Sequence, residues 1–313
     1  MKPLQSAFLP FILAALAAPL GAHPDYNATH RIEVTPVPAT EAPPGPNQVS
    51  ITIEGDLRVI VSNGLPDHTT GRFPNADNPN RISAQSYRFT MPAKPVAEVR
   101  STPLRMQPFG IAINGVLFDP GTAEYWQDDR GSGWHYDAKG DAFSLGLDAN
   151  NAHVQPNGAY HYHGIPTALL ARLTKGQPAM TLLGWAADGF PIYGAWGHRT
   201  GPDAASELVT LKTSFRLKKG MRPTSNGQPG GAYDGSFVED FEYIAGSGDL
   251  DECSGRFGVT PEFPAGTFYY VLTSDFPFVP RAFRGTPDKS FAQRGGPGGP
   301  GGPGGRRGPP PPR

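Results

Sequence analysis

Short runs of alternating apolar and polar residues dominate the chain and predict strands. Residues 49–64, VSITIEGDLRVIVSNG, alternate on both sides of Gly55-Asp56, and residues 109–119 alternate on both sides of Asn114-Gly115. Alternation interrupted by a Gly-containing turn is typical of a β-hairpin, and Asn-Gly favours the positive φ angles of a type I′ turn. Further short strands are predicted at 87–91, 180–186, 214–217, 237–244 and 267–273.

Helical patterns are rare, and the fold class follows from that. The clearest helix is TALLARL at 167–173, which Pro166 can begin, whereas residues 206–211 fit either a helix or a strand. The chain holds 40 Gly and 36 Pro in 313 residues, and each such residue inside a helix costs about 1 to 3 kcal/mol. We therefore expect a mainly β domain, a sandwich or irregular barrel with long loops and one or two short helices. The stretch 121–160 is long and loop-like, and long loops in compact domains are usually functional.

Composition divides the chain into four regions. Residues 1–22 are predicted to be a signal peptide, because Lys2 precedes an uncharged apolar stretch that is too short to span a membrane and ends at Ala22. Residues 23–48 form a Pro-rich leader, residues 49–288 the folded domain, and residues 289–313 a disordered Gly/Pro-rich tail. The chain is thus expected to be secreted or periplasmic, cleaved after Ala22, without a transmembrane segment.

Charge and cysteine content remove two further possibilities. The formal net charge is −1, which gives no electrostatic basis for binding nucleic acid. Cys253 is the single cysteine, so no intramolecular disulfide can form. The sequence does not identify a protein partner.

Candidate chemistry concentrates in residues 152–166, AHVQPNGAYHYHGIP. His161 and His163 are two apart in a predicted strand, so their side chains share one face, roughly 6.5 to 7 Å apart. His153 precedes a Pro-Asn-Gly turn and can fold back as a third nitrogen ligand. Imidazole suits transition metals and is a poor calcium ligand, so the metal partner expected here is copper or zinc. The alternative is that these histidines are hydrogen-bonded polar residues packed among aromatic rings.

Three other side chains are candidate supplementary ligands. Asp188 stands at a turn before Gly189, and Asp251 and Cys253 are two apart, which places them on one face of an extended segment. Structural roles also explain them: Asp188 can close an Asx turn, and Cys253 can be a small buried side chain.

Several sequence blocks, in this order, resemble the YHYH domain family, named for the four residues that stand here at 160–163. The resemblance extends from about residue 60 to residue 285 and implies an exported domain with a histidine-centred site, without indicating a reaction. Besides the signature, the similar blocks are FPN at 73–75 with NPN at 78–80, IAINGVLFDPG at 111–121, DGFPIYG at 188–194, LDECSGRFGVTPEFPAGTFYY at 250–270 and FPFVPRAFRG at 276–285.

Three functional hypotheses follow. The first is a metal-binding domain with His161 and His163 as central ligands and His153 as the third. The second is a metal-dependent enzyme, hydrolytic or oxidative, which needs an open coordination position beside a carboxylate base such as Asp188 or Glu252. The third is a non-catalytic surface or adhesion module that makes contacts through aromatic residues and the Gly/Pro tail.

Overall fold

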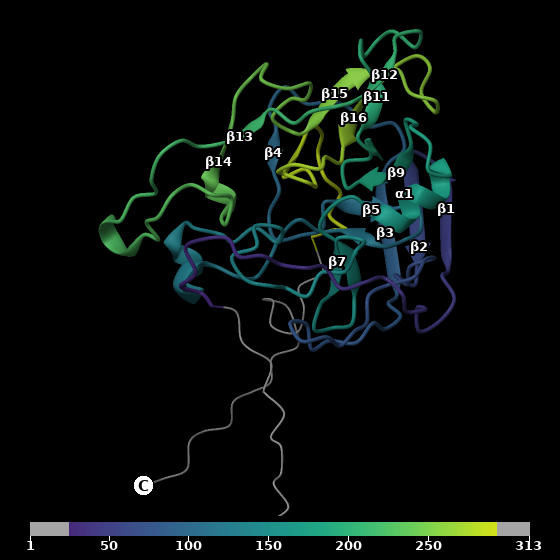
Figure 1. Ribbon diagram of the computed structural model, residues 1–313. Helices are drawn as coiled ribbons and strands as arrows, with labels where there is room; N and C mark the ends of the chain where they lie inside the picture. Colours follow the sequence, from purple (N-terminus) through teal and green to yellow (C-terminus); the bar gives the residue numbers. More distant parts are fainter. Residues whose placement is uncertain (1–24, 293–313) are drawn as a thin grey trace, which may run out of the picture.

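Short strands joined by long loops make up most of the computed structural model, which describes residues 25–292 (Figure 1). The predicted signal peptide, its cleavage site and all but the first residues of the predicted tail lie outside the described residues. Within 25–292 there is one α-helix, α1 (Thr167–Thr174), which begins after Pro166 as predicted. The mainly β class with long loops is therefore confirmed.

The largest sheet has eight strands. In spatial order they are β15 (Gly255–Gly258), β16 (Thr267–Val271), β10 (Pro191–Tyr193), β9 (Leu182–Ala186), β5 (Gly110–Ala112), β6 (Leu117–Phe118), β8 (Tyr160–Tyr162) and β7 (Ala152–Val154). The sheet is mixed: β6 pairs with β8, and β10 with β16, in parallel, and its other pairs are antiparallel.

A second, three-stranded sheet covers part of the first. It consists of β1 (Val49–Glu54), β2 (Leu57–Ser62) and β3 (Tyr87–Pro92), paired antiparallel. Ile60, Phe89 and Met91 of this sheet are fully buried and join one apolar cluster with Ile111 and Phe118 of the larger sheet. Burying each such side chain stabilises the fold by about 1.5 to 3 kcal/mol. The main core thus lies between two packed sheets, as in a sandwich.

Both predicted hairpins are present, but the Asn-Gly turn has a different geometry from the one predicted. Of that pair Gly115 alone has a positive φ, 79°, so the turn is not type I′. The Gly115 N–H donates to Ala112 O, and the Ala112 N–H donates to Val116 O, which is the three-residue loop with a left-handed Gly. The Asn114 side chain donates to Asp67 and to the Tyr162 hydroxyl instead.

The remaining elements are short and lie around the two main sheets. Residues 237–244, predicted as one strand, form a 3-10 turn followed by a three-residue strand, and the ambiguous 206–211 contains a strand. The short strands form three pairs: β4 (Thr102–Pro103) with β17 (Ala282–Phe283), β11 (Trp196–His198) with β12 (Leu208–Thr210), and β13 (Phe215–Leu217) with β14 (Phe241–Tyr243). The 3-10 turns are η1 (Trp126–Asp128), η2 (Arg130–Ser132), η3 (Ser225–Gly227) and η4 (Val238–Asp240).

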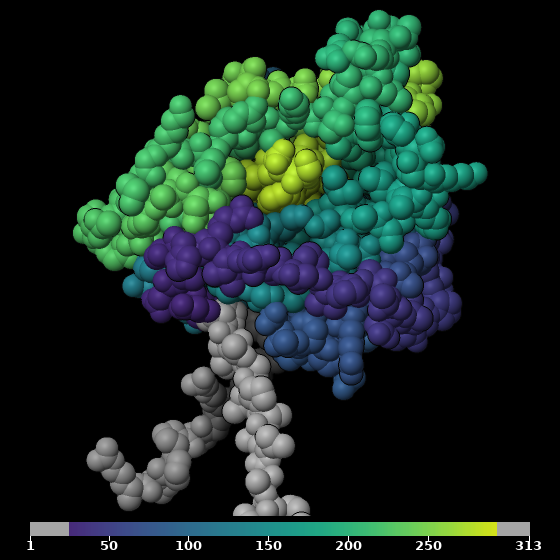
Figure 2. All heavy atoms as spheres, viewed as in Figure 1, coloured from purple at the N-terminus to yellow at the C-terminus, as the bar shows by residue number. Residues whose placement is uncertain are grey.

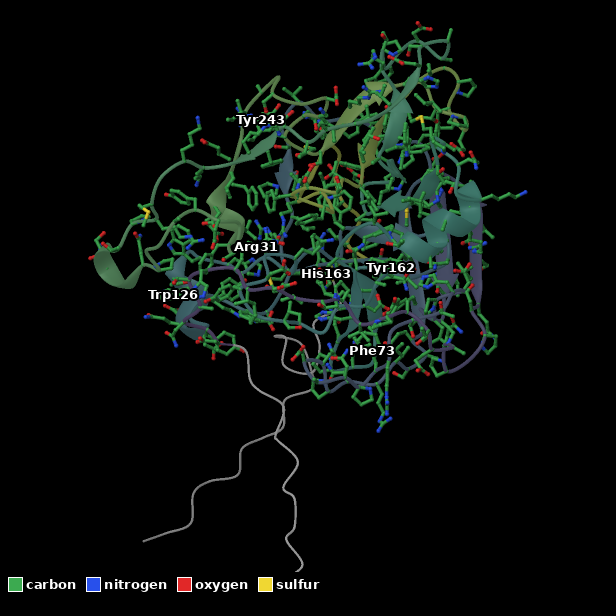
Figure 3. All side chains as sticks on the ribbon, in the orientation of Figure 1. Arg31, Phe73, Trp126, Tyr162, His163 and Tyr243 are labelled. Atoms are coloured by element: carbon green, nitrogen blue, oxygen red, sulfur yellow. The ribbon has the colours of Figure 1, made fainter. Side chains whose placement is uncertain are left out.

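The leader from residue 25 onward runs along the surface of the domain, and Figure 2 shows it in purple across the front face. Val37 pairs with residues 147 and 149 of the long loop through backbone hydrogen bonds. Ala28 joins a second apolar cluster with Trp126, Trp134, Tyr136 and Phe237. Trp126 of this cluster lies on the left of Figure 3, below Tyr243 of the later strand segment.

Candidate metal centre

A local hairpin places two of the three candidate histidines directly opposite each other. His153 on β7 pairs with His161 on β8, and the connecting turn uses Gly158 with a φ of 85°. A Cβ at Gly158 would lie 1.9 Å from the Ser83 hydroxyl, so the turn accepts glycine only. His163 follows β8, and its backbone N–H donates to the backbone oxygen of Asn151 at 2.7 Å. The third ring is therefore held beside the other two by the end of the same ladder.

The tyrosines of the signature lie on the opposite face of β8. The Tyr160 hydroxyl donates to Asp148 Oδ2 at 2.7 Å, and the Tyr162 hydroxyl is bonded to Asn114 Nδ2 and His68 Nε2. Figure 3 places Tyr162 and His163 near the centre of the molecule, beside β7. Alternation along the strand separates an anchoring tyrosine face from a histidine face.

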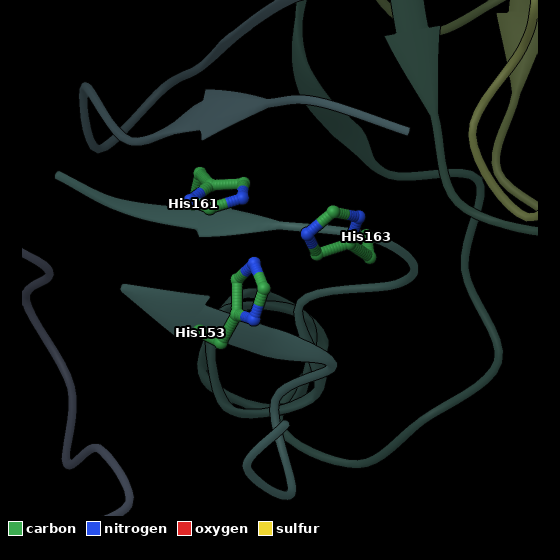
Figure 4. Close-up of side chains that lie close together, drawn as sticks. All are labelled: His153, His161 and His163. Atoms are coloured by element: carbon green, nitrogen blue, oxygen red, sulfur yellow. The ribbon is translucent and has the colours of Figure 1, made fainter. Parts of the chain in front are cut away.

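The three imidazole rings converge in a nearly equilateral arrangement (Figure 4). Ring centroids are 4.7 Å apart for His153 and His161, 4.7 Å for His153 and His163, and 4.6 Å for His161 and His163. One nitrogen of each ring lies within 4.8 Å of the others. Zinc binds imidazole nitrogen at about 2.0 to 2.1 Å, so the three nitrogens would have to move closer together to share one ion.

Hydrogen bonds fix the tautomers of two rings. His153 Nδ1 lies 3.0 Å from Leu145 O, and His161 Nδ1 lies 3.1 Å from Ala159 O. A carbonyl oxygen only accepts, so Nδ1 carries the proton in both rings and Nε2 keeps its lone pair. A backbone carbonyl that orients the distal N–H is the usual second partner of a metal-binding histidine.

His163 has no partner at either ring nitrogen among the described residues, although it is only 2% exposed. Leaving such a group buried and unpaired costs about 1 to 3 kcal/mol. The interpretation of the histidines as ordinary hydrogen-bonded core residues does not account for this ring, whereas a ligand shared with the other two does.

The site favours neutral imidazoles. Burial is the main cause that lowers the pKa of His153 to about 3 and of His161 to about 4, and it holds the pKa of His163 well below its usual range. Neighbouring histidines, Arg281 and Lys139 lower the pKa of His163 further. All three rings are therefore neutral at neutral pH, the form that binds a metal.

A carboxylate that sequence analysis did not select, Asp119, lies on the histidine face. It follows β6, and its N–H donates to Tyr162 O at 3.0 Å, which sets it beside His163 in the parallel ladder. Gln155, two residues after His153, donates to Asp119 Oδ2 at 3.4 Å. The residue ends the IAINGVLFD strand pattern, but its position depends on the pairing of β6 with β8, which no local signal predicts.

The supplementary candidates occupy a different part of the domain. Asp188 Oδ2 accepts from the Tyr270 hydroxyl at 2.5 Å and from Gly285 N, and Asp251 pairs with Arg284. Cys253 is fully buried, and burial raises the pKa of its thiol to about 12, so it is a neutral thiol. Among the described residues, the group able to share one ion consists of the three histidines and none of these.

Comparison with known proteins agrees with the sequence blocks. The sequence profile of the family described as YHYH protein matches residues 88–285, which covers more than half of the chain. None of the curated proteins or solved structures compared with the chain matched it.

Proposed function

The chain belongs to the YHYH protein family, and we propose that it is an exported domain that binds one transition-metal ion through His153, His161 and His163. The observation that carries the proposal is the buried His163 ring, whose nitrogens have no hydrogen-bond partner among residues 25–292 and which lies within 4.8 Å of a nitrogen of each of the other two rings. A metal bond offsets the cost of burying these nitrogens. This explains why three titratable groups share one buried site.

Zinc and copper fit the donor set best. Three neutral imidazoles are borderline ligands that suit both ions, and the Irving–Williams order gives copper(II) the higher affinity. The choice between them depends on supply in the compartment where the protein resides. Elemental analysis of protein purified from that compartment identifies the resident ion.

Export is supported by the sequence of residues 1–22. Within residues 25–292 no helix has the length and apolar character needed to cross a membrane. The intact mass of the secreted or periplasmic protein tests this part, since cleavage after Ala22 leaves His23 as the first residue.

A metal-dependent enzyme is the second candidate, favoured by one observation. The described residues supply three ligands, and a three-ligand site keeps a position open for water or substrate, as catalytic zinc sites do. Asp119, which follows the strand beside β8, is a further candidate for the carboxylate base besides Asp188 and Glu252.

Metal stoichiometry tests the proposal. The mature protein, equilibrated with zinc or copper and desalted, is expected to retain one ion per chain, and the His161→Ala/His163→Ala double variant is expected to retain none. His198→Ala is a matched control, because that ring bonds Ser206 O outside the cluster. Equal metal content in wild type and double variant would show that the triad is not a metal site.

A further inference from the structure

Asp119 follows β6, the strand that lies beside β8 on the side opposite β7. In the parallel ladder Leu117 pairs with His161 and Phe118 with Tyr162, so the next residue, Asp119, stands beside His163. Phe118 contacts the Tyr162 ring at a centroid distance of 5.6 Å, which places Phe118 on the tyrosine face. Alternation then directs the Asp119 side chain to the histidine face.

The bond to Gln155 shows how far this carboxylate reaches. Gln155 shares a face with His153, and β7 and β6 lie on opposite sides of β8. A side-chain bond between Gln155 and Asp119 must therefore pass over the central strand on the side where the imidazoles lie. The carboxylate is not close enough to all three histidine nitrogens to join the ligand group, so it is a neighbour of the site.

Among residues 25–292, the hydrogen-bond donors to Asp119 do not use its full accepting capacity. Its Oδ1 accepts from Gly121 N at 3.1 Å, and its Oδ2 accepts from Gln155 at 3.4 Å, whereas an ionised carboxylate can accept about four hydrogen bonds. The nearby cation Arg281 is already paired with Asp137. The remaining lone pairs can accept from a further hydrogen-bond donor, and such a bond to an ionised carboxylate is a strong one.

We propose that Asp119 accepts a hydrogen bond from the ligand that occupies the fourth coordination position, and thereby selects small neutral molecules with an O–H or N–H over anions that have none. The inference rests on the proposed metal site and names the class of ligand that completes it. His161 and His163 are buried, while His153 and Asp119 keep some exposed surface, so the ligand enters past these two and must be small.

The selection has two physical sources. A water, alcohol or peroxide molecule can bind the metal through oxygen and donate its hydrogen to the carboxylate. An anion such as azide offers no hydrogen and meets a negative charge at close range in a poorly screened site. Asp119 is therefore a specificity-determining residue that acts on the fourth ligand.

Azide binding to the cobalt-loaded protein tests the proposal, since the visible spectrum of Co²⁺ reports a change of its fourth ligand. At pH 8, Asp119→Asn is expected to bind azide about tenfold or more tightly than wild type, with unchanged cobalt content. Asp119→Ser, which also removes the charge and keeps an oxygen for the Gly121 N–H, is expected to shift affinity in the same direction. Asp148→Asn is the matched control, because that carboxylate is buried on the tyrosine face of β8.

The outcomes separate this inference from the proposed function. Cobalt bound at wild-type level with unchanged azide affinity in both Asp119 variants overturns the role of Asp119 alone. Loss of cobalt in folded Asp119 variants would make the residue a direct ligand and also overturns it. Failure of the wild-type protein to bind cobalt overturns the proposed metal site itself.

Discussion

At the scale of single residues, the signature Tyr160–His163 divides two tasks between alternate side chains. The tyrosine hydroxyls are paired with Asp148, Asn114 and His68, so they stabilise the strand without a ligand. The histidine rings face one another, and the His163 ring has no hydrogen-bond partner among residues 25–292. On β8, the histidine face thus keeps bonding capacity that the described residues do not use.

Replacing His163 by leucine is expected to leave the metal-free protein as stable as wild type, or more stable by about 1 to 2 kcal/mol. The substitution keeps a similar volume and removes two buried nitrogens that have no partner among residues 25–292. Denaturant unfolding in the presence of a chelator measures the effect, and metal binding by the same variant should be lost.

Tyr162→Phe is the matched comparison on the opposite face of β8. It deletes a hydroxyl bonded to Asn114 and His68, so we expect a loss of about 1 to 3 kcal/mol. If His163→Leu were instead the more destabilising of the two, His163 would be a structural residue rather than a ligand.

The sequence alone predicts much of this site, because the residues that determine it are close together in the chain. His-x-His on a strand and a Pro-Asn-Gly turn before it determine which side chains share a face and where His153 returns, as β7 and β8 show. Asp119 could not be found this way, because the contact between β6 and β8 joins segments about forty residues apart. The unpaired state of His163 likewise depends on what surrounds it in three dimensions.

At the scale of elements, β8 is the centre of the site because it has one local and one distant neighbour. The hairpin with β7 is predictable from its turn, as were β1 with β2 and β5 with β6. The parallel pairing with β6 joins segments that are far apart in the sequence, and turn residues do not predict it. Strand positions were therefore largely predictable, whereas sheet order was not.

The metal-free protein is expected to lose stability as pH falls from about 6.5 toward 4. In the folded state burial lowers the pKa of His153 to about 3 and of His161 to about 4, so the unfolded chain binds protons in this range that the folded chain does not. Each such histidine can remove up to about 1.4 kcal/mol per pH unit. Denaturant unfolding at several pH values, with a chelator present, measures the slope.

Two buried carboxyls change the stability in the opposite direction as pH falls, so their contribution to the pH dependence must be separated from that of the histidines. Burial raises the pKa of Asp119 and of Asp188 to about 6, so their favourable contribution is present at low pH and is lost as pH rises from about 4 to 6. Both are retained in His161→Ala/His163→Ala, so the difference between its slope and that of wild type reports the histidines. Equal slopes would contradict the assigned pKa shifts.

At the scale of the whole molecule, the leader is part of the folded structure. The Tyr136 hydroxyl donates to Ala28 O at 2.8 Å, and Arg222, which is fully buried, donates to Thr29 O at 2.7 Å. Arg222 also pairs with the buried Asp240. Removing the leader would take one hydrogen-bond acceptor from the Arg222 guanidinium and would expose part of the aromatic cluster around Tyr136.

Deleting residues 25–33 from the mature chain is therefore expected to destabilise it by about 2 to 4 kcal/mol, from several lost hydrogen bonds and the exposure of apolar side chains. Arg222 dominates the expected loss, because a buried guanidinium that loses an acceptor is not compensated by water. Denaturant unfolding compares the truncated and full-length mature proteins. Deleting residues 293–313, predicted from composition to be disordered, should leave the unfolding free energy unchanged, and equal stability of both truncations would mean that the contacts of Ala28 and Thr29 contribute nothing.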